Sequence, residues 1–196
     1  MFSFVESKLF TRLVGDYLTD DEYSRLQAAL AEAEYDAGND EAAVRAADKA
    51  LAAAPGNMTA LIQKGYALTR IAGKAKTDEA WRAARRHFVA VNKIENDHPI
   101  PLMYFYLGFL QTDKEPTKIA IDGLEWALEL APYDANLRMM VARRQMQDKR
   151  FAEAIRTIRP LAYNPHAGAD NPAIALLETA REALAAQSAS AAAATP

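Results

Sequence analysis

The sequence contains no cysteine. Disulfide bridges, cysteine-ligated zinc sites and thiol catalysis are therefore excluded, and an oxidising compartment gains no support. Glycine and proline, which most often interrupt regular structure, number only 8 and 9, whereas hydrophobic residues make up 51% of the chain. Alanine is the most frequent of them and is the strongest helix former. This composition favours packed helices over a β-rich fold.

Long apolar runs are also missing. The longest, from Pro101 to Leu110, is about half of what a membrane-spanning helix needs. The first residues lack the apolar core of a signal peptide, because charged side chains interrupt them. These are Glu6, Lys8, Arg12 and Asp16. We expect a soluble, cytoplasmic protein that makes no contact with a membrane.

The chain has no excess of positive charge. Its formal net charge is -3 and its pI is about 5.7, so nothing global suggests nucleic-acid binding. The three histidines, His87, His98 and His166, stand in no metal-binding spacing, and we expect them at the surface or in loops. Glycine-rich phosphate loops are absent. We therefore predict no catalytic residue, no metal site and no cofactor, and a protein that is not an enzyme.

What the sequence does contain is an internal repeat of about 34 residues. One copy shows Tyr104, Leu107-Gly108, Ala120, Leu124, Ala127 and Pro132. About 34 positions later stand Arg138, Val141-Ala142, Ala154, Ile158 and Leu161, with Pro165 one position early. Toward the N-terminus, Gln27, Ala31, Ala43, Ala47, Ala50 and Pro55 follow the same spacing. A longer copy covers 58–100, with extra length at 73–77 and before Pro99.

This pattern resembles the tetratricopeptide repeat, a helix–turn–helix unit, over roughly residues 24–168. The resemblance implies an all-α fold: a right-handed helical superhelix of about four repeats with capping helices at both ends. Small residues such as Gly108 and Ala120 would let the two helices of a repeat approach closely. Tyr104, Leu107 and Leu110 would then pack inside the repeat. Gly38 and Gly73 would lie at the turns between helices.

The predicted domain organisation follows from these repeats. It comprises an N-terminal cap at 1–23, repeats at 24–57, 58–100, 101–134 and 135–168, a C-terminal capping helix at 169–186 and a disordered tail at 187–196. Asn171 would cap the last helix, with Pro172 in its first position. The tail has no core-forming residue beyond alanine.

The opening segment carries a second resemblance. The start of the chain resembles HigB-type toxins of the RelE superfamily in "FVES" at 4–7, Phe10 and "YLTDDEYSRLQ" at 17–27. These toxins cut messenger RNA at the ribosome, and the resemblance implies a bacterial source. The basic catalytic part of that family does not follow here, so none of its catalytic residues can be assigned. Thr19 and Glu22 form a predicted capping box for a helix that runs from Asp20 to about Ala37. We interpret the segment as an N-terminal cap of the repeat array.

The repeat register also predicts a binding groove. In the tetratricopeptide family, the first helix of each repeat lines a concave surface. The register places on it Ile62, Tyr66, Leu102, Phe105, Phe109, Met139, Arg143 and Met146. Phe105 and Phe109 fall one helical turn apart, and sequence alone leaves open whether they pack in the core or face an apolar groove for a partner helix or extended peptide.

Two basic stretches complete the candidates. "RAARRH" at 82–87 and "RRQMQDKR" at 143–150 are typical of solvated helix faces, and they also suit an anionic peptide or RNA. The function that the sequence favours is a non-catalytic scaffold that binds a partner protein or peptide in the groove. The alternative is an RNA-directed, toxin-like protein related to ribosome-dependent mRNA interferases, although we consider a nucleic-acid partner unlikely on this charge balance.

Overall fold

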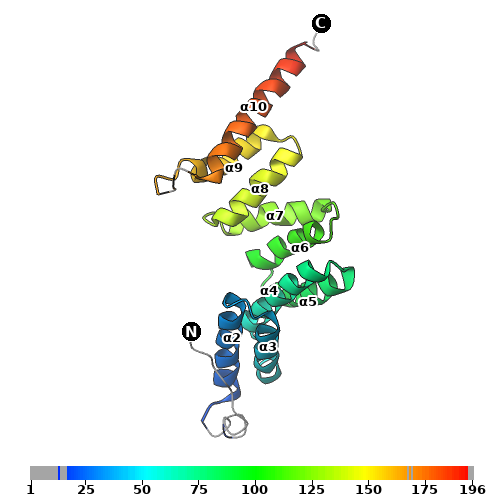
Figure 1. The fold of residues 1–196 in the computed structure, drawn as a ribbon, viewed down its shortest axis with the longest axis vertical. Helices are drawn as coiled ribbons and strands as arrows, with labels where there is room; N and C mark the ends of the chain where they lie inside the picture. Colours follow the sequence, from blue (N-terminus) through cyan, green and yellow to red (C-terminus); the bar gives the residue numbers. More distant parts are fainter. Residues whose placement is uncertain (1–12, 14–16, 167, 169, 194–196) are drawn as a thin grey trace. The chain divides into compact units, whose positions relative to one another are not determined.

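The computed structural model describes residues 13, 17–166, 168 and 170–193. In these ranges the regular secondary structure is α-helical and no strand occurs (Figure 1). The helices are α2 (Asp20–Asp36), α3 (Asp40–Ala53), α4 (Met58–Ala75), α5 (Asp78–Ile94), α6 (Pro99–Gln111), α7 (Lys118–Leu130), α8 (Ala135–Gln147), α9 (Phe151–Ala162) and α10 (Pro172–Ala193). The predicted all-α fold class is confirmed.

Side-chain caps explain where many of these helices begin. Thr19 and Glu22 form the predicted capping box at the start of α2, in which each side chain accepts a hydrogen bond from the other's backbone N–H. Four further helices have a cap whose side-chain oxygen accepts a hydrogen bond from the N–H three residues on. These caps are Asn57, Thr77, Thr117 and Asp134. Each cap satisfies a backbone donor that the helix itself leaves unpaired.

The chain divides into two compact units, residues 1–115 and 116–196. The first contains α2 to α6 and the second α7 to α10, and within each unit consecutive helices pack against one another. Each predicted repeat holds two consecutive helices, but the boundary between the units falls inside the third predicted repeat. The division into four repeats therefore stays a proposal.

Alanine dominates the core at the start of the first unit. Ala31, Ala43, Ala47, Ala50 and Ala60 have no exposed surface. Because alanine side chains are so short, α2, α3 and the start of α4 can approach closely, and the buried Ser24 hydroxyl donates a hydrogen bond to the Ala50 carbonyl at 2.8 Å across that contact. The packing therefore depends on small side chains, as the repeat pattern predicted.

Larger rings fill the rest of the first unit. Phe88 and Trp81 of α5 are buried, and each lies against a glycine. A Cβ atom at Gly65 would lie 2.6 Å from the Phe88 ring, and one at Gly108 would overlap the Trp81 indole. Gly108 was expected to bring the two helices of its own repeat together. In the structure it makes room for the preceding helix, α5.

The core of the second unit is built around α9. Ile158 and Ala162 pack with Ala142 of α8 and with Leu177 of α10. The Asn171 side chain accepts a hydrogen bond from the Ala173 backbone N–H at 3.0 Å, which confirms the predicted cap of α10. The last helix thus covers an apolar face that α8 and α9 would otherwise leave exposed.

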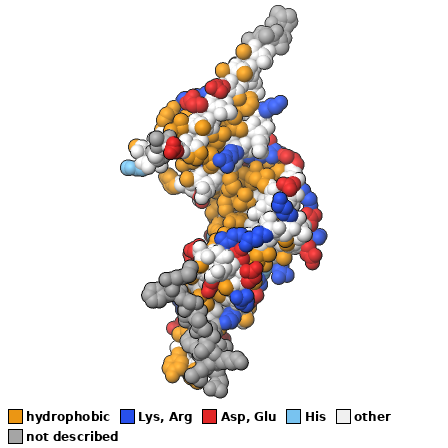
Figure 2. All heavy atoms as spheres, viewed as in Figure 1, with side chains coloured by type: hydrophobic (Ala, Val, Ile, Leu, Met, Phe, Trp, Pro, Cys, Tyr) orange, Lys and Arg blue, Asp and Glu red, His pale blue; other side chains and the backbone are white. Residues whose placement is uncertain are grey.

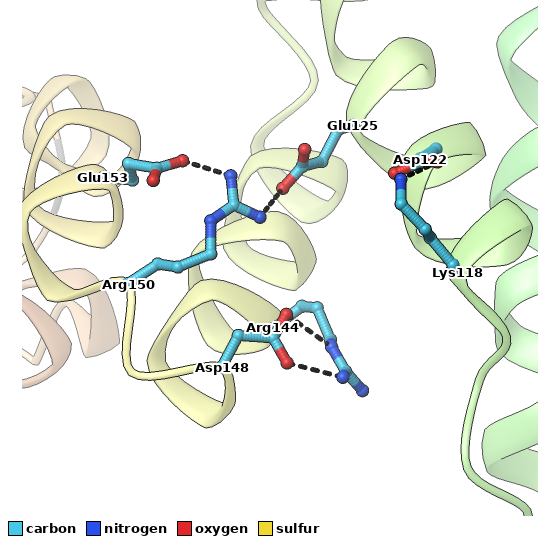
Figure 3. Close-up of polar contacts among 7 residues, drawn as sticks. All are labelled: Lys118, Asp122, Glu125, Arg144, Asp148, Arg150 and Glu153. Carbon is cyan, nitrogen blue, oxygen red and sulfur yellow. Dashed lines mark hydrogen bonds and ion pairs between the residues drawn. The ribbon is translucent and has the colours of Figure 1, made fainter.

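A polar network fixes the turn between α8 and α9 (Figure 3). Arg150 precedes α9, donates to Glu125 of α7 at 2.6 Å and forms an ion pair with Glu153 in the first turn of α9. The hydrogen bonds to Glu153 and, to a lesser extent, to Glu125 raise the pKa of Arg150. The hydrogen bond from Arg150 also lowers the pKa of Glu153. Arg144 pairs with Asp148 through two hydrogen bonds at the end of α8. The Arg150 contacts therefore join α7 to the first turn of α9, whereas the Arg144–Asp148 pair lies within the end of α8.

Three local predictions need correction. Gly73 lies inside α4, which runs on to Ala75, and the residue with left-handed backbone geometry is Lys76, at φ 52°. The extra length of that repeat thus lengthens a helix rather than a turn. Helix α10 continues to Ala193, beyond the predicted end at 186, because its alanine-rich end favours helix even without core contacts. Leu110, expected inside its repeat, is 44% exposed.

Gly38 is confirmed at a turn. It lies between α2 and α3 with a φ of 85°, which glycine adopts at little cost. Of the toxin-like segment, residues 1–12 and 14–16 fall outside the described residues.

Candidate functional site

The eight predicted groove residues lie in both units. Ile62, Tyr66, Leu102, Phe105 and Phe109 belong to the first, and Met139, Arg143 and Met146 to the second. Their surroundings differ from one residue to the next.

A row of tyrosines connects the first helices of successive pairs in the first unit. The Tyr66 ring of α4 lies 5.6 Å from the Tyr35 ring of α2 and 4.8 Å from the Tyr104 ring of α6, measured between centroids. Tyr104 also stacks on Phe88 of α5 at 4.5 Å. Tyr104 was expected to pack inside its own repeat. It instead bridges α4 and α5, and burial raises the pKa of its hydroxyl, with smaller contributions from Tyr66 and Tyr35.

A buried carboxylate closes one end of this tyrosine row. Asp40, only 1% exposed, forms ion pairs with Arg70 and Lys74 of α4. The Arg70 guanidinium lies 3.9 Å from the centre of the Tyr35 ring. Burial alone would raise the pKa of Asp40, but hydrogen bonds from Lys74 and Arg70 bring it below its ordinary value. The row and its ion pairs hold neighbouring helix pairs together, so we assign Tyr66 mainly a structural role.

Leu102 and Phe105 lie in an apolar pocket between α5 and α6. Phe88, Val89 and Pro101 also line it, and Arg85 and Asn92 are its polar lining residues. Val89 is 46% exposed and Phe105 half-buried, so the pocket is open to solvent. It encloses about 160 Å³. That volume is below the roughly 300–1,000 Å³ of small-molecule sites and suits a single side chain.

Phe109 lies in a second pocket between the same two helices. It encloses about 180 Å³ and is lined by Asp78, Trp81, Arg82, Arg85, Gly108, Phe109, Thr112 and Lys114. Lys114 donates two hydrogen bonds to Asp78, at 2.6 and 2.7 Å, and together with Arg82 it lowers the pKa of that carboxyl. Phe105 and Phe109 meet edge to face with their ring centres 5.4 Å apart. Because Arg85 lines both pockets, the two adjoin.

The second unit has a wider hollow beside α8. Met139 and Arg143 line it with Asn136, Met140, Leu161, Asn164 and the start of α10, around about 560 Å³. Figure 2 shows one face of this unit, on which hydrophobic side chains lie with charged side chains among them. Met146 lies half-buried on the same helix.

The histidines differ from what the sequence suggested at one position. His87 is buried in α5 rather than exposed or in a loop, and burial, with Lys64 and Arg86 nearby, lowers its pKa to about 4. It is therefore neutral near pH 7. His98 caps α6, and His166 is exposed. Among the described residues, no group of three or more His, Asp or Glu could hold a metal ion. None of the described helices is both long and apolar enough to cross a membrane.

Sequence reasoning missed several residues of this site. Trp81, Val89 and Lys114 line the pockets, but none of them stands out in the repeat pattern, because each comes from the second helix of a pair or from a loop. A usable signal existed for Trp81: a glycine in the middle of an apolar helix often marks a large side chain packed against it. Arg82 and Arg85 were noticed only as part of a basic stretch.

Comparisons with known proteins give matches among solved structures. No family model and no curated protein matches the sequence. Among solved structures, a crystal structure of MamA protein superposes with a TM-score of 0.61 at 17% identity, covering 84% of each chain. A MamA RS-1 ArsTM double mutant gives 0.58 at 16% identity, over 80% of this chain and 85% of the other.

These likenesses concern the fold alone, since both identities are low. The resemblance of residues 1–30 to HigB-type toxins receives no support from them. The tetratricopeptide resemblance is supported at the level of the fold: the chain is similar in structure to MamA, a tetratricopeptide-repeat protein.

Proposed function

We propose that this protein is a non-catalytic scaffold that binds a segment of a partner protein between α5 and α6. The observation that carries the proposal is the apolar pocket of Val89, Leu102 and Phe105, which opens to solvent and suits one inserted side chain. The likeness in fold to a tetratricopeptide-repeat protein supports it, because such arrays present extended surfaces to partners.

Three of the predicted groove residues keep a role as contacts: Leu102, Phe105 and Phe109. Their rings and side chains would cover the apolar anchor of the partner segment. An aromatic or aliphatic anchor buried in such a pocket is the usual energetic centre of a protein interface. Met139 and Arg143 would belong to a separate contact in the second unit, and Ile62, Tyr66 and Met146 are assigned no contact.

The experiment that tests this proposal is the double substitution Phe105→Ala with Phe109→Ala. Both rings are half-buried and lie outside the fully buried core, so the variant should fold. Partners that wild type recovers from the native extract should be lost, because the loss of a hot spot costs about 2 kcal/mol or more of binding free energy. Circular dichroism would check that the helices remain.

Leu110→Ala provides the matched control. Leu110 lies on the same helix and is 44% exposed, but it lines neither pocket. This variant should capture the same partners as wild type. Equal capture by the double variant would place binding elsewhere, and an unfolded double variant would show that the rings belong to the core.

A further inference from the structure

The arginines beside the apolar pocket have no carboxylate partner. Arg82 and Arg85 stand one helical turn apart on α5 and line the pocket that holds Phe109. Neither forms an ion pair or a hydrogen bond within the described part of the chain. Arg85 lies 5.9 Å from the centre of the Phe105 ring, and Arg82 attracts Asp78 electrostatically without forming an ion pair with it.

Several other cations of the first unit contact a carboxylate directly. Lys64 pairs with Asp48, Arg70 and Lys74 with Asp40, and Lys114 with Asp78. Asp78 is the one carboxylate that lines the Phe109 pocket, and its oxygens are already bonded to Lys114. The two arginines therefore leave an uncompensated positive charge at the pocket, in a protein whose net charge is -3.

The floor of the same pocket is aromatic. The Trp81 indole lies directly beneath Gly108, and Phe109 forms part of the wall. These two rings give one side of the pocket low polarity, and low polarity strengthens the attraction between a guanidinium and an incoming anion because less water screens it. Guanidinium groups also bind carboxylates through paired hydrogen bonds. Since Arg85 reaches both pockets, a bound carboxylate would lie next to an apolar side chain in the neighbouring one.

We propose that Arg82 and Arg85 bind the carboxylates of an acidic partner segment whose apolar residue enters the pocket of Leu102 and Phe105. This inference rests on the proposed function and gives the partner its chemistry: an apolar anchor flanked by aspartate or glutamate. A protein segment fits better than RNA. Nucleic-acid binding needs a row of phosphate contacts, whereas only two uncompensated arginines line this pocket.

The test uses the full chain and two synthetic peptides labelled with a fluorophore. One has a phenylalanine flanked by glutamates, and the other has the same phenylalanine flanked by glutamines. Fluorescence anisotropy should show that the glutamate peptide binds at least about tenfold more tightly, and that added salt removes this difference. A single-stranded RNA of similar charge serves as the competing probe and should bind more weakly than the glutamate peptide.

Charge reversal then locates the contact. Arg82→Glu with Arg85→Glu should abolish the preference for the glutamate peptide and leave weak binding of the glutamine peptide. Arg86→Glu reverses the same charge on the same helix at an exposed position outside both pockets and should keep the preference. Arg85→Gln, which keeps the length and polarity of the side chain, should reduce the preference only in part.

The outcomes separate this inference from the proposed function. Equal binding of both peptides that is lost in the Phe105→Ala and Phe109→Ala variant would overturn the charge recognition and leave the apolar pocket in place. Peptide binding that survives in that variant would overturn the proposed function itself. Failure of wild type to bind the glutamate peptide, or tighter binding of RNA, would overturn the inference.

Discussion

Gly108 shows how one residue can set the distance between two helices. The Trp81 indole occupies the space that a side chain at this position would need, and a buried ring cannot move without displacing its neighbours. Sequence reasoning recognised that a small residue was required here but assigned it to the wrong neighbour. The repeat pattern encodes the size of a residue and leaves open which of two nearby helices it faces.

Gly108→Leu should therefore destabilise the first unit. The added side chain must displace Trp81, and overpacking of this kind typically costs about 1–3 kcal/mol. Gly73→Leu is the matched control, because Gly73 is also helical and no atom lies within 4 Å of an added Cβ. A thermal melt should show a lower transition for the first variant and no loss for the second. Equal melts for both variants and wild type would contradict the close contact.

Asp40 has a comparable importance at the scale of secondary-structure elements. It begins α3, and its carboxylate binds two cations of α4, so one buried side chain fixes the register between two helix pairs. Capping residues act at the same scale and are readable from sequence, as the box of Thr19 and Glu22 shows. Ion pairs between helices are not readable in this way, because they depend on which faces meet.

Asp40→Asn should lower the free energy of unfolding by about 1.5–3 kcal/mol, the usual value of hydrogen bonds to charged groups. The pKa of Asp40 is lowered in the folded protein, so its contribution exists above the ordinary carboxyl pKa and is lost as the pH falls through the lowered value. Asp122→Asn, which removes an exposed ion pair with Lys118, should change stability by less than about 0.5 kcal/mol. Denaturant unfolding at neutral pH would compare them, and equal losses would contradict the account.

At the scale of the whole molecule, the sequence predicted the fold class better than the site. Small residues at a regular spacing were enough to predict an all-helical chain, because close helix packing tolerates little else at those positions. The end of α10 was mispredicted, since alanine without core contacts still favours helix.

The lining of the two candidate pockets was predicted only in part. Leu102, Phe105 and Phe109 were identified, yet their pockets also need Trp81, Arg85 and Val89 from the neighbouring helix. A repeat alignment compares equivalent positions in successive copies. It therefore finds residues that share a role and misses side chains that meet across two different helices. Arg82 and Arg85 lay in a recognised basic stretch, but only the structure distinguishes them from Arg86, which lines neither pocket.

Site-specific photo-crosslinking tests the central claim, that a partner segment binds between α5 and α6, most directly. A photoreactive phenylalanine analogue would replace Val89, which is 46% exposed in the apolar pocket, and in a separate variant Ile119, which is 76% exposed on α7. Irradiation in the native cell should join the Val89 variant to a discrete partner, and mass spectrometry should locate the crosslink in an acidic segment beside an apolar residue. The Ile119 variant should give no such product. The same partner crosslinked through Ile119 and not through Val89 would contradict the account.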